Sequence, residues 1–293
     1  MSFKTGTCLV LLLSLCSPVM SLAWVKGIYV TQPTMESSKN VRYLVENAKA
    51  FHINTFVVDF YRKSSRYQKN IAMVKANGIR YVARIVMFPD GALDSQIKSE
   101  TYLERRYQQI REAISLGADV IQLDYIRYRP TQRPSRQNAE NIYKIVQQVE
   151  TLLQGTGVLL EMDIFGVAAH KEALAIGQNA VLFAKSLHAI CPMVYPSHYE
   201  PFRYHATRPY ETVYSSLVAL RQQLAHRPDV KVHAYIELYN YRYPLSRQNK
   251  INYILAELRA VRDAQADGWY AWSANNKYSL LFAILRAQNT PSQ

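Results

Sequence analysis

The chain has 293 residues, of which 35 are Lys or Arg and 22 are Asp or Glu, so its formal charge at pH 7 is +13. This length does not require a second domain, and no linker or low-complexity run interrupts the sequence. The charge favours association with polyanions such as acidic glycans, anionic envelope polymers or nucleic acid. Because the basic residues are dispersed, a plain solvated basic surface explains the charge equally well.

The first residues have the pattern of an export signal. Lys4 gives a positive start, Leu9–Leu15 is an apolar run, and Ser21-Leu22-Ala23 is a small-x-small cleavage site. We therefore predict a signal peptide over residues 1–23 and an exported chain, 24–293, in the periplasm or outside the cell. No stable membrane span is expected after cleavage, and an uncleaved anchor is the alternative. Of the 3 cysteines only Cys191 then remains, which excludes an internal disulfide.

From residue 25 onward, apolar β-rich stretches alternate with amphipathic helical stretches. The predicted strands are Val25–Thr31, Asn54–Phe60, Ile79–Phe88, Ala118–Tyr128, Gly157–Gly166, Ala189–Pro196, Val230–Tyr239 and Gly268–Ala274. The predicted helices are Ser37–Ala50, Arg66–Asn77, Glu100–Leu116, a long helix ending near Leu153, Glu172–Leu187, Pro209–His226, Ser246–Gln265 and Tyr278–Ala287. Such alternation is typical of parallel βα units. Eight units in one domain predict an α/β protein with a single (β/α)8 TIM barrel.

The predicted strands carry polar or aromatic residues near their C-terminal ends. One residue comes from each of the second to eighth strands: Asp59, Arg84, Asp124, Asp163, Tyr195, Glu237 and Trp272. The C-terminal ends of parallel barrel strands meet at one face, where barrel enzymes place their sites. Buried carboxylates that outnumber their cationic partners are costly, so we interpret this ring as a functional site. A structural salt-bridge network is the alternative interpretation.

Several carboxylates with one arginine and aromatic neighbours are the residues that glycoside hydrolysis needs. Arg84 lies between Asp59 and Asp124 in strand order, so it would keep Asp124 ionised as nucleophile or base. Asp163, further from Arg84, is freer to retain a proton and act as the acid. Glu237 is the alternative acid. The predicted sugar-contacting residues are Asp59, Arg84, Tyr195, His198, Tyr199 and Trp272, and filling the core is the alternative role of the aromatic ones.

Six motifs resemble those of a bacterial barrel family that is labelled as a domain of unknown function and is similar to glycoside hydrolases. They are Lys26–Thr31, Ala83–Val86, Ile121–Arg127, Asp163–Gly166, Pro192–Tyr199, and Gly268-Trp269 with Trp272. The resemblance implies a (β/α)8 fold and action on a polysaccharide. Two places depart from the family pattern: Phe60-Tyr61-Arg62-Lys63 follows Asp59 where the family has a Lys-Asp loop, and Glu237 stands where the family tends to have glutamine. The second departure argues against Glu237 as the catalytic acid.

The sequence indicates no metal and no cofactor. His198 and His205 match no standard ligand spacing, and neither a Gly-rich phosphate loop nor a nucleophile elbow is present. Two rival functions remain, a non-catalytic glycan-binding barrel and a basic polyanion-binding protein. Because we predict export, we expect a polysaccharide substrate and no nucleic acid, and we expect a monomer. The sugar, the linkage and the anomeric outcome stay open.

Overall fold

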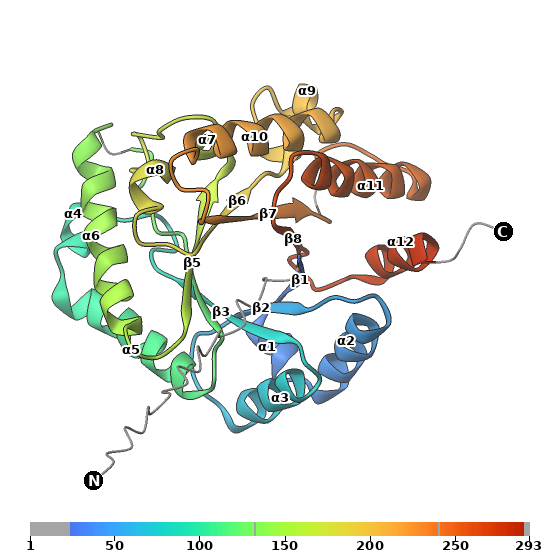
Figure 1. Cartoon of the computed structure of the whole chain (residues 1–293), viewed down its shortest axis with the longest axis horizontal. Coiled ribbons are helices and arrows are strands. Elements are labelled where there is room, and N and C mark those ends of the chain that lie inside the picture. Colours follow the sequence, from blue (N-terminus) through green and yellow to red (C-terminus); the bar gives the residue numbers. More distant parts are fainter. Residues whose placement is uncertain (1–23, 132, 240, 290–293) are drawn as a thin grey trace, which may run out of the picture.

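The computed structural model describes residues 24–131, 133–239 and 241–289. Within them, eight parallel strands close a barrel in sequence order, with β8 pairing with β1 (Figure 1). The strands are β1 Val25–Val30, β2 Thr55–Asp59, β3 Arg80–Val86, β4 Val120–Asp124, β5 Leu159–Phe165, β6 Ala189–Met193, β7 Lys231–Glu237 and β8 Gly268–Trp272. The predicted (β/α)8 TIM barrel is therefore confirmed.

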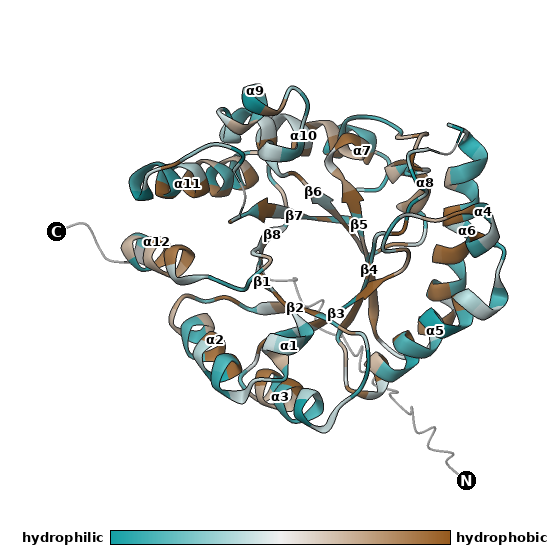
Figure 2. Cartoon of the chain, turned by 180° about the vertical axis from the view of Figure 1, so that it is seen from behind, coloured by the Kyte–Doolittle hydropathy of each residue, from teal (hydrophilic) through white to brown (hydrophobic). Residues whose placement is uncertain are grey.

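Helices surround this barrel (Figure 1). The long ones are α2 Ser38–Ala50, α3 Ser65–Ala76, α5 Glu100–Ser115, α6 Arg136–Leu153, α10 Pro209–Gln223, α11 Arg247–Asp263 and α12 Ser279–Asn289. The short ones are α1 Gln32–Met35, α4 Asp94–Ile97, α7 Gly166–His170, α8 Ala180–Phe183, the 3₁₀ turn η1 Pro196–His198, and α9 Phe202–Ala206. Serine N-caps begin α2, α3, α5, α6 and α11, where each hydroxyl accepts a backbone N–H of the first turn. In α6 the hydrophobic segments turn toward the barrel (Figure 2).

Period-two alternation along the strands builds two cores. Outward residues such as Ile28, Phe56 and Ile121 pack in one large cluster with the helices. Inward residues form a second cluster inside the barrel, made of Val25, Val57, Val82, Val120, Cys191, Tyr195, Tyr235 and Tyr270. The Tyr270 ring fits inside because β1 has a glycine opposite it: a Cβ at Gly27 would lie 2.4 Å from the ring.

The predicted helix Glu172–Leu187 is wrong over most of its length. Residues 174–177 form a turn that an antiparallel bridge between Ala173 and Gln178 closes, and only Ala180–Phe183 is helical. Gly177 has a left-handed φ of 65°, and the Gln178 side chain accepts the N–H of Phe165 at 2.9 Å instead of following a helical face. Asn179 then caps α8 by accepting the N–H of Leu182. Tertiary hydrogen bonds at the barrel end have overridden a sequence that resembles a helix.

The predicted strand Ala118–Tyr128 is shorter in the structure. Strand β4 ends at Asp124 because Tyr125 has φ 50°, a left-handed conformation that cannot continue a strand. The predicted signal peptide lies outside the described residues. No helix in the described part of the chain is long and apolar enough to cross a bilayer.

Candidate active site

A cavity of about 1000 Å³ opens at the C-terminal ends of the strands. The residues that line it are Tyr29, Tyr61, Arg84, Val86, Pro89, Asp124, Tyr125, Asp163, Phe165, Gly166, Val167, His170, Met193, Tyr195, His198, Tyr199, Glu200, His205, Tyr235, Trp272 and Ala274. Seven of the nine residues predicted for the site are among them, and Asp59 and Glu237 are not. A cavity of this size at this face is where a barrel binds its ligand.

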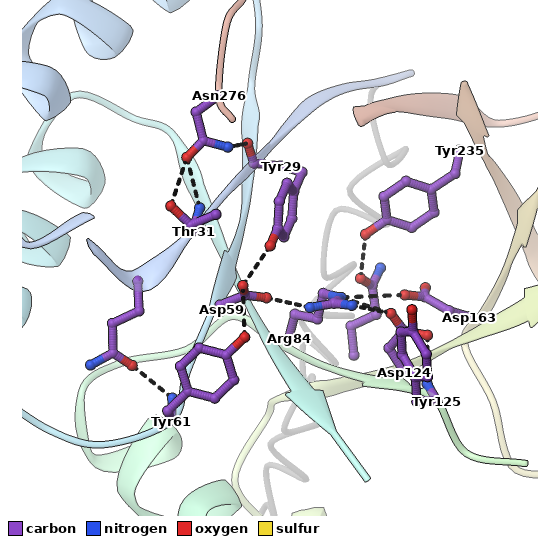
Figure 3. A network of polar contacts seen from close by, with 12 residues as sticks. Tyr29, Thr31, Asp59, Tyr61, Arg84, Asp124, Tyr125, Asp163, Tyr235 and Asn276 are labelled. Atoms are coloured by element: carbon purple, nitrogen blue, oxygen red, sulfur yellow. Dashed lines mark hydrogen bonds and ion pairs between the residues drawn. The ribbon is translucent and has the colours of Figure 1, made fainter. Parts of the chain in front are cut away.

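Arg84 joins three aspartates on neighbouring strands (Figure 3). Its Nη1 pairs with Asp59, while Nε donates to Oδ2 of Asp124 at 2.8 Å and Nη2 donates to the same oxygen. The Oδ2 of Asp163 is more distant, 4.0 Å from Nε. Burial alone would lower the pKa of Arg84, but the charges of Asp124 and Asp59 raise it well above its ordinary value. Arg84 is thus a permanent cation that offsets two of the three carboxylates.

Asp163 is the carboxyl group that this arrangement leaves without a full partner. Its side chain is almost completely buried, and among the described residues its Oδ1 has no hydrogen-bond partner. Burial, followed by the negative charge of Asp124 and a hydrogen bond to it, raises the pKa of Asp163 well above its ordinary range. Asp163 is therefore a carboxyl group that retains a proton more readily than an ordinary aspartate does.

Asp59 supports this group from behind the cavity wall. Its Oδ2 accepts hydrogen bonds from Tyr29 at 2.5 Å and from Tyr61 at 3.1 Å, while its Oδ1 pairs with Arg84 (Figure 3). Burial and the charge of Asp59 raise the pKa of both phenols, that of Tyr61 to about 12. Both rings line the cavity. The structure thus places Asp59 where it orients Arg84 and two tyrosines.

Glu237 lies at the end of β7 but turns toward helix α11. Its Oε1 accepts the N–H of Ser197 at 3.0 Å and the hydroxyl of Tyr253 at 2.6 Å, and its Oε2 accepts the Ser197 hydroxyl at 2.6 Å. Burial raises the pKa of Glu237 to about 7, against the lowering effect of these hydrogen bonds. His198, whose Nδ1 is 3.8 Å from Oε2, lines the cavity, whereas Glu237 does not.

Aromatic rings form much of the cavity wall. Tyr195 stacks on Trp272, with ring centroids 5.4 Å apart and an interplanar angle of 29°. The Tyr199 hydroxyl accepts a hydrogen bond from Ser216 at 3.0 Å. Tyr199 also packs against Gly166, where a Cβ would lie 2.1 Å from its hydroxyl. Flat apolar faces of this kind suit the stacking of sugar rings.

Sequence reasoning missed other aromatic residues that line the cavity: Tyr29, Tyr61, Tyr125, Phe165 and Tyr235. Period-two alternation could have found Tyr29 and Tyr235, because they share the inward faces of β1 and β7 with Val25 and His233. Tyr125 could not be found in this way, because its direction depends on the left-handed backbone after β4.

A second polar cluster lies deeper in the barrel, and its donor atoms could in principle hold a metal. Atoms of Glu161, Cys191 and His233 lie within 4.8 Å of one another. Glu161 already accepts hydrogen bonds from Tyr270 at 2.9 Å and from Gln122 at 3.2 Å, and it pairs with His233 at 3.3 Å. Burial would raise the pKa of Glu161, but the charge of His233 lowers it to about 2. Glu161 is thus hydrogen-bonded within the barrel, as buried polar groups usually are.

The fold and this cavity define a barrel with a buried cluster of carboxyl groups at its mouth. Comparisons with known proteins identify its family. A model of the family described as a putative glycosyl hydrolase domain matches residues 106–278, more than half of the chain. The chain belongs to this family. A comparison with curated proteins gave no match.

Solved structures of glycan-degrading barrels are similar in fold. The glycoside hydrolase domain of PgaB (BpsB) from Bordetella bronchiseptica aligns with a TM-score of 0.70 at 9% identity, over 92% of this chain and 99% of that one. The endo-β-1,4-mannanase of Thermotoga petrophila gives 0.65 at 10% identity, over 92% and 78%. The spore cortex-lytic enzyme SleL of Bacillus megaterium gives 0.63 at 11%, over 89% and 73%. At such identities the likeness shows the fold alone.

Proposed function

We propose that the protein is a glycoside hydrolase that cleaves a polysaccharide or a cell-envelope glycan by paired-carboxylate acid/base catalysis. The observation that carries the proposal is the pairing of Asp163, whose raised pKa favours its protonated form, with Asp124, which accepts two hydrogen bonds from Arg84, in one aromatic-walled cavity. Glycosidases divide the acid and the nucleophilic roles between two carboxyl groups in this way. Family membership supports the same reaction class.

In this mechanism Asp163 donates its proton to the glycosidic oxygen as the bond from that oxygen to the anomeric carbon breaks. Asp124 attacks the anomeric carbon and forms a glycosyl ester, and Asp163, now ionised, takes a proton from the water that hydrolyses the ester. The N–H of Tyr125, 2.5 Å from Oδ1 of Asp124, and the Arg84 guanidinium orient the carboxylate. The stacked pair Tyr195 and Trp272 would hold a sugar ring against this group.

A mechanism with Asp124 as the nucleophile predicts a retaining reaction. Inverting enzymes separate their carboxyl groups by roughly 6.5–9.5 Å to admit a water between them. Here a hydrogen bond to Asp124 contributes to the raised pKa of Asp163, and both groups lie beside the Nε of Arg84, so no such water fits between them. NMR of the first-formed sugar should show the anomer of the substrate. The opposite anomer would rule out Asp124 as the nucleophile.

The export predicted from residues 1–23 supports a substrate outside the cytoplasm. The test of function is hydrolysis across a panel of polysaccharides, including acidic and envelope glycans. Asp124→Asn and Asp163→Asn should each lower turnover by roughly two or more orders of magnitude while glycan binding survives. Asp119→Asn, at the opposite end of strand β4, is the matched control and should keep its turnover. Binding without cleavage across the panel would favour the glycan-binding barrel, and binding that weakens steeply with salt for any polyanion would favour the polyanion binder.

A further inference from the structure

The segment between β6 and α10 forms one side of the cavity. Tyr195, His198, Tyr199, Glu200 and His205 all come from it. This segment contains only the short elements η1 and α9, so long-range contacts have to fix its position.

Several of these contacts come from β7 and from the residues that follow it. Tyr243 donates its hydroxyl to the carbonyl oxygen of Ala206 at 3.2 Å, and the Arg242 guanidinium lies 3.9 Å from the centre of the Phe202 ring. These contacts hold the outer part of the segment, beyond the residues nearest the carboxyl groups. The inner part is held by Glu237.

Glu237 binds Ser197 through both a backbone and a side-chain donor. Because the two bonds use different carboxylate oxygens, at 3.0 and 2.6 Å, they fix the place and the orientation of this residue together. Ser197 stands between His198 and Pro196, and Tyr195 precedes them. The Tyr195 ring in turn contacts His198 and Trp272, with centroids 5.4 Å away in both cases. A movement of Ser197 would therefore displace three rings of the cavity wall.

A second buried carboxyl group keeps Glu237 in place. Glu257 on α11 accepts the backbone N–H of Glu237 at 3.1 Å, and among the described residues its Oε2 has no partner. Burial and the charge of Glu237 raise the pKa of Glu257 well above its ordinary value, so Glu257 carries the proton of the pair. The other titratable or charged groups near Glu237 in the described part of the chain are Tyr195, His198, Tyr241, Arg242, Tyr243 and Tyr253.

We propose that Glu237 is a positioning residue for the cavity, which holds Ser197 and thereby sets the places of Tyr195 and His198 at the sugar-binding wall. The proposal rests on the proposed glycosidase function. As an anion, Glu237 accepts three hydrogen bonds at once. A glutamine can keep the pattern, because its oxygen accepts from Ser197 N–H and Tyr253 while its amide donates to the Ser197 hydroxyl.

The first test needs no substrate. It measures acrylamide quenching of Trp272 fluorescence, obtained as the difference between each protein and its Trp272→Phe partner. Glu237→Ala and Ser197→Ala should both increase quenching of Trp272, whereas Glu237→Gln should restore the native value. Glu257→Gln, which keeps an acceptor for the Glu237 N–H, is the matched control and should resemble the native protein. Equal quenching in all of these proteins would overturn the proposal, whether or not any glycan is cleaved.

The second test uses the glycan that the polysaccharide panel shows to be cleaved. Glu237→Ala should lower kcat/KM roughly ten-fold or more through misplacement of the wall, and Glu237→Gln should recover most of it. If Glu237 were instead the proton donor, the glutamine variant would be as inactive as the alanine variant. If Glu237→Ala fails to fold, Ser197→Ala tests the same contact with a smaller change. An unchanged kcat/KM in Ser197→Ala would contradict the positioning role.

Discussion

Tyr125 offers a sharp test of how the candidate site is built. Its φ of 50° lies in the left-handed region, where any side chain other than glycine is strained by about 1–2 kcal/mol. Its N–H is fixed by Oδ1 of Asp124 at 2.5 Å, and its ring lines the cavity and meets Phe165 edge-on with centroids 6.3 Å apart. We infer that the strain is kept because this turn aims both the carboxylate and the ring.

Two substitutions separate the strain from the ring. Tyr125→Ala removes the ring and keeps the strain, whereas Tyr125→Gly removes both. Glycine ordinarily makes a chain less stable than alanine by about 0.5–1 kcal/mol through unfolded-state entropy. Relief of about 1–2 kcal/mol of strain should outweigh this cost here, so Tyr125→Gly should be more stable than Tyr125→Ala by about 0.5–1 kcal/mol.

Urea unfolding, followed by far-UV circular dichroism, measures this difference directly from the midpoints and slopes. Both variants should lose turnover on the cleaved glycan, because each lacks the ring beside Asp124. If the alanine variant is the more stable one, the left-handed backbone at Tyr125 costs nothing and the strain argument is refuted. If the glycine variant keeps full turnover, the ring has no part in the site.

Two further predictions concern charge. Arg84→Lys keeps a cation but cannot contact Asp59 and Asp124 through a planar fork. Turnover should therefore fall by at least roughly ten-fold, and the melting temperature should drop. An unchanged melting temperature would show that the three-carboxylate group does not depend on Arg84. The folded-state pKa of Glu237, about 7, lies above its ordinary value of 4.5. The folded state therefore binds more protons between these pH values, and its free energy of unfolding should fall as pH rises from about 4.5 to about 7. Denaturant unfolding of Glu237→Gln across this range should show a shallower fall, and an identical pH profile would contradict the raised pKa.

The barrel could be predicted because local and long-range signals agree. Each strand is a short apolar run bounded by turn residues, and each long helix follows with an amphipathic pattern and often a serine cap. The helix expected at Glu172–Leu187 failed because residues 172–179 are used for tertiary contacts. The N–H of Tyr128 donates a hydrogen bond to the carbonyl oxygen of Ile176. This bond joins segments far apart in the sequence, so no local sequence pattern predicts it.

The site could be predicted only as far as strand faces determine it. Asp124, Asp163 and Arg84 come together because alternation and parallel register place them at one end of adjacent strands. Alternation also puts Glu237 on the inward face of β7, beyond Tyr235, yet its carboxylate is bound by Ser197 and Tyr253. That outcome depends on the course of the segment after β6, which the strand pattern does not specify.

Three features that are costly to folding lie in the cavity wall or directly behind it. Tyr125 has a strained backbone, Asp163 is a buried carboxyl group whose Oδ1 lacks a partner among the described residues, and Glu237 is more easily buried with a proton than without one. The carboxyl group that binds Ser197 twice is thus the group whose ionisation lowers the free energy of unfolding as pH rises above 4.5. Such costs persist at sites where a fixed geometry matters more for function than the lost stability matters for folding. It follows that substitutions that raise the free energy of unfolding at Tyr125 or Glu237 should not raise activity, whereas the opposite result would mean that the cavity is not the working part of the molecule.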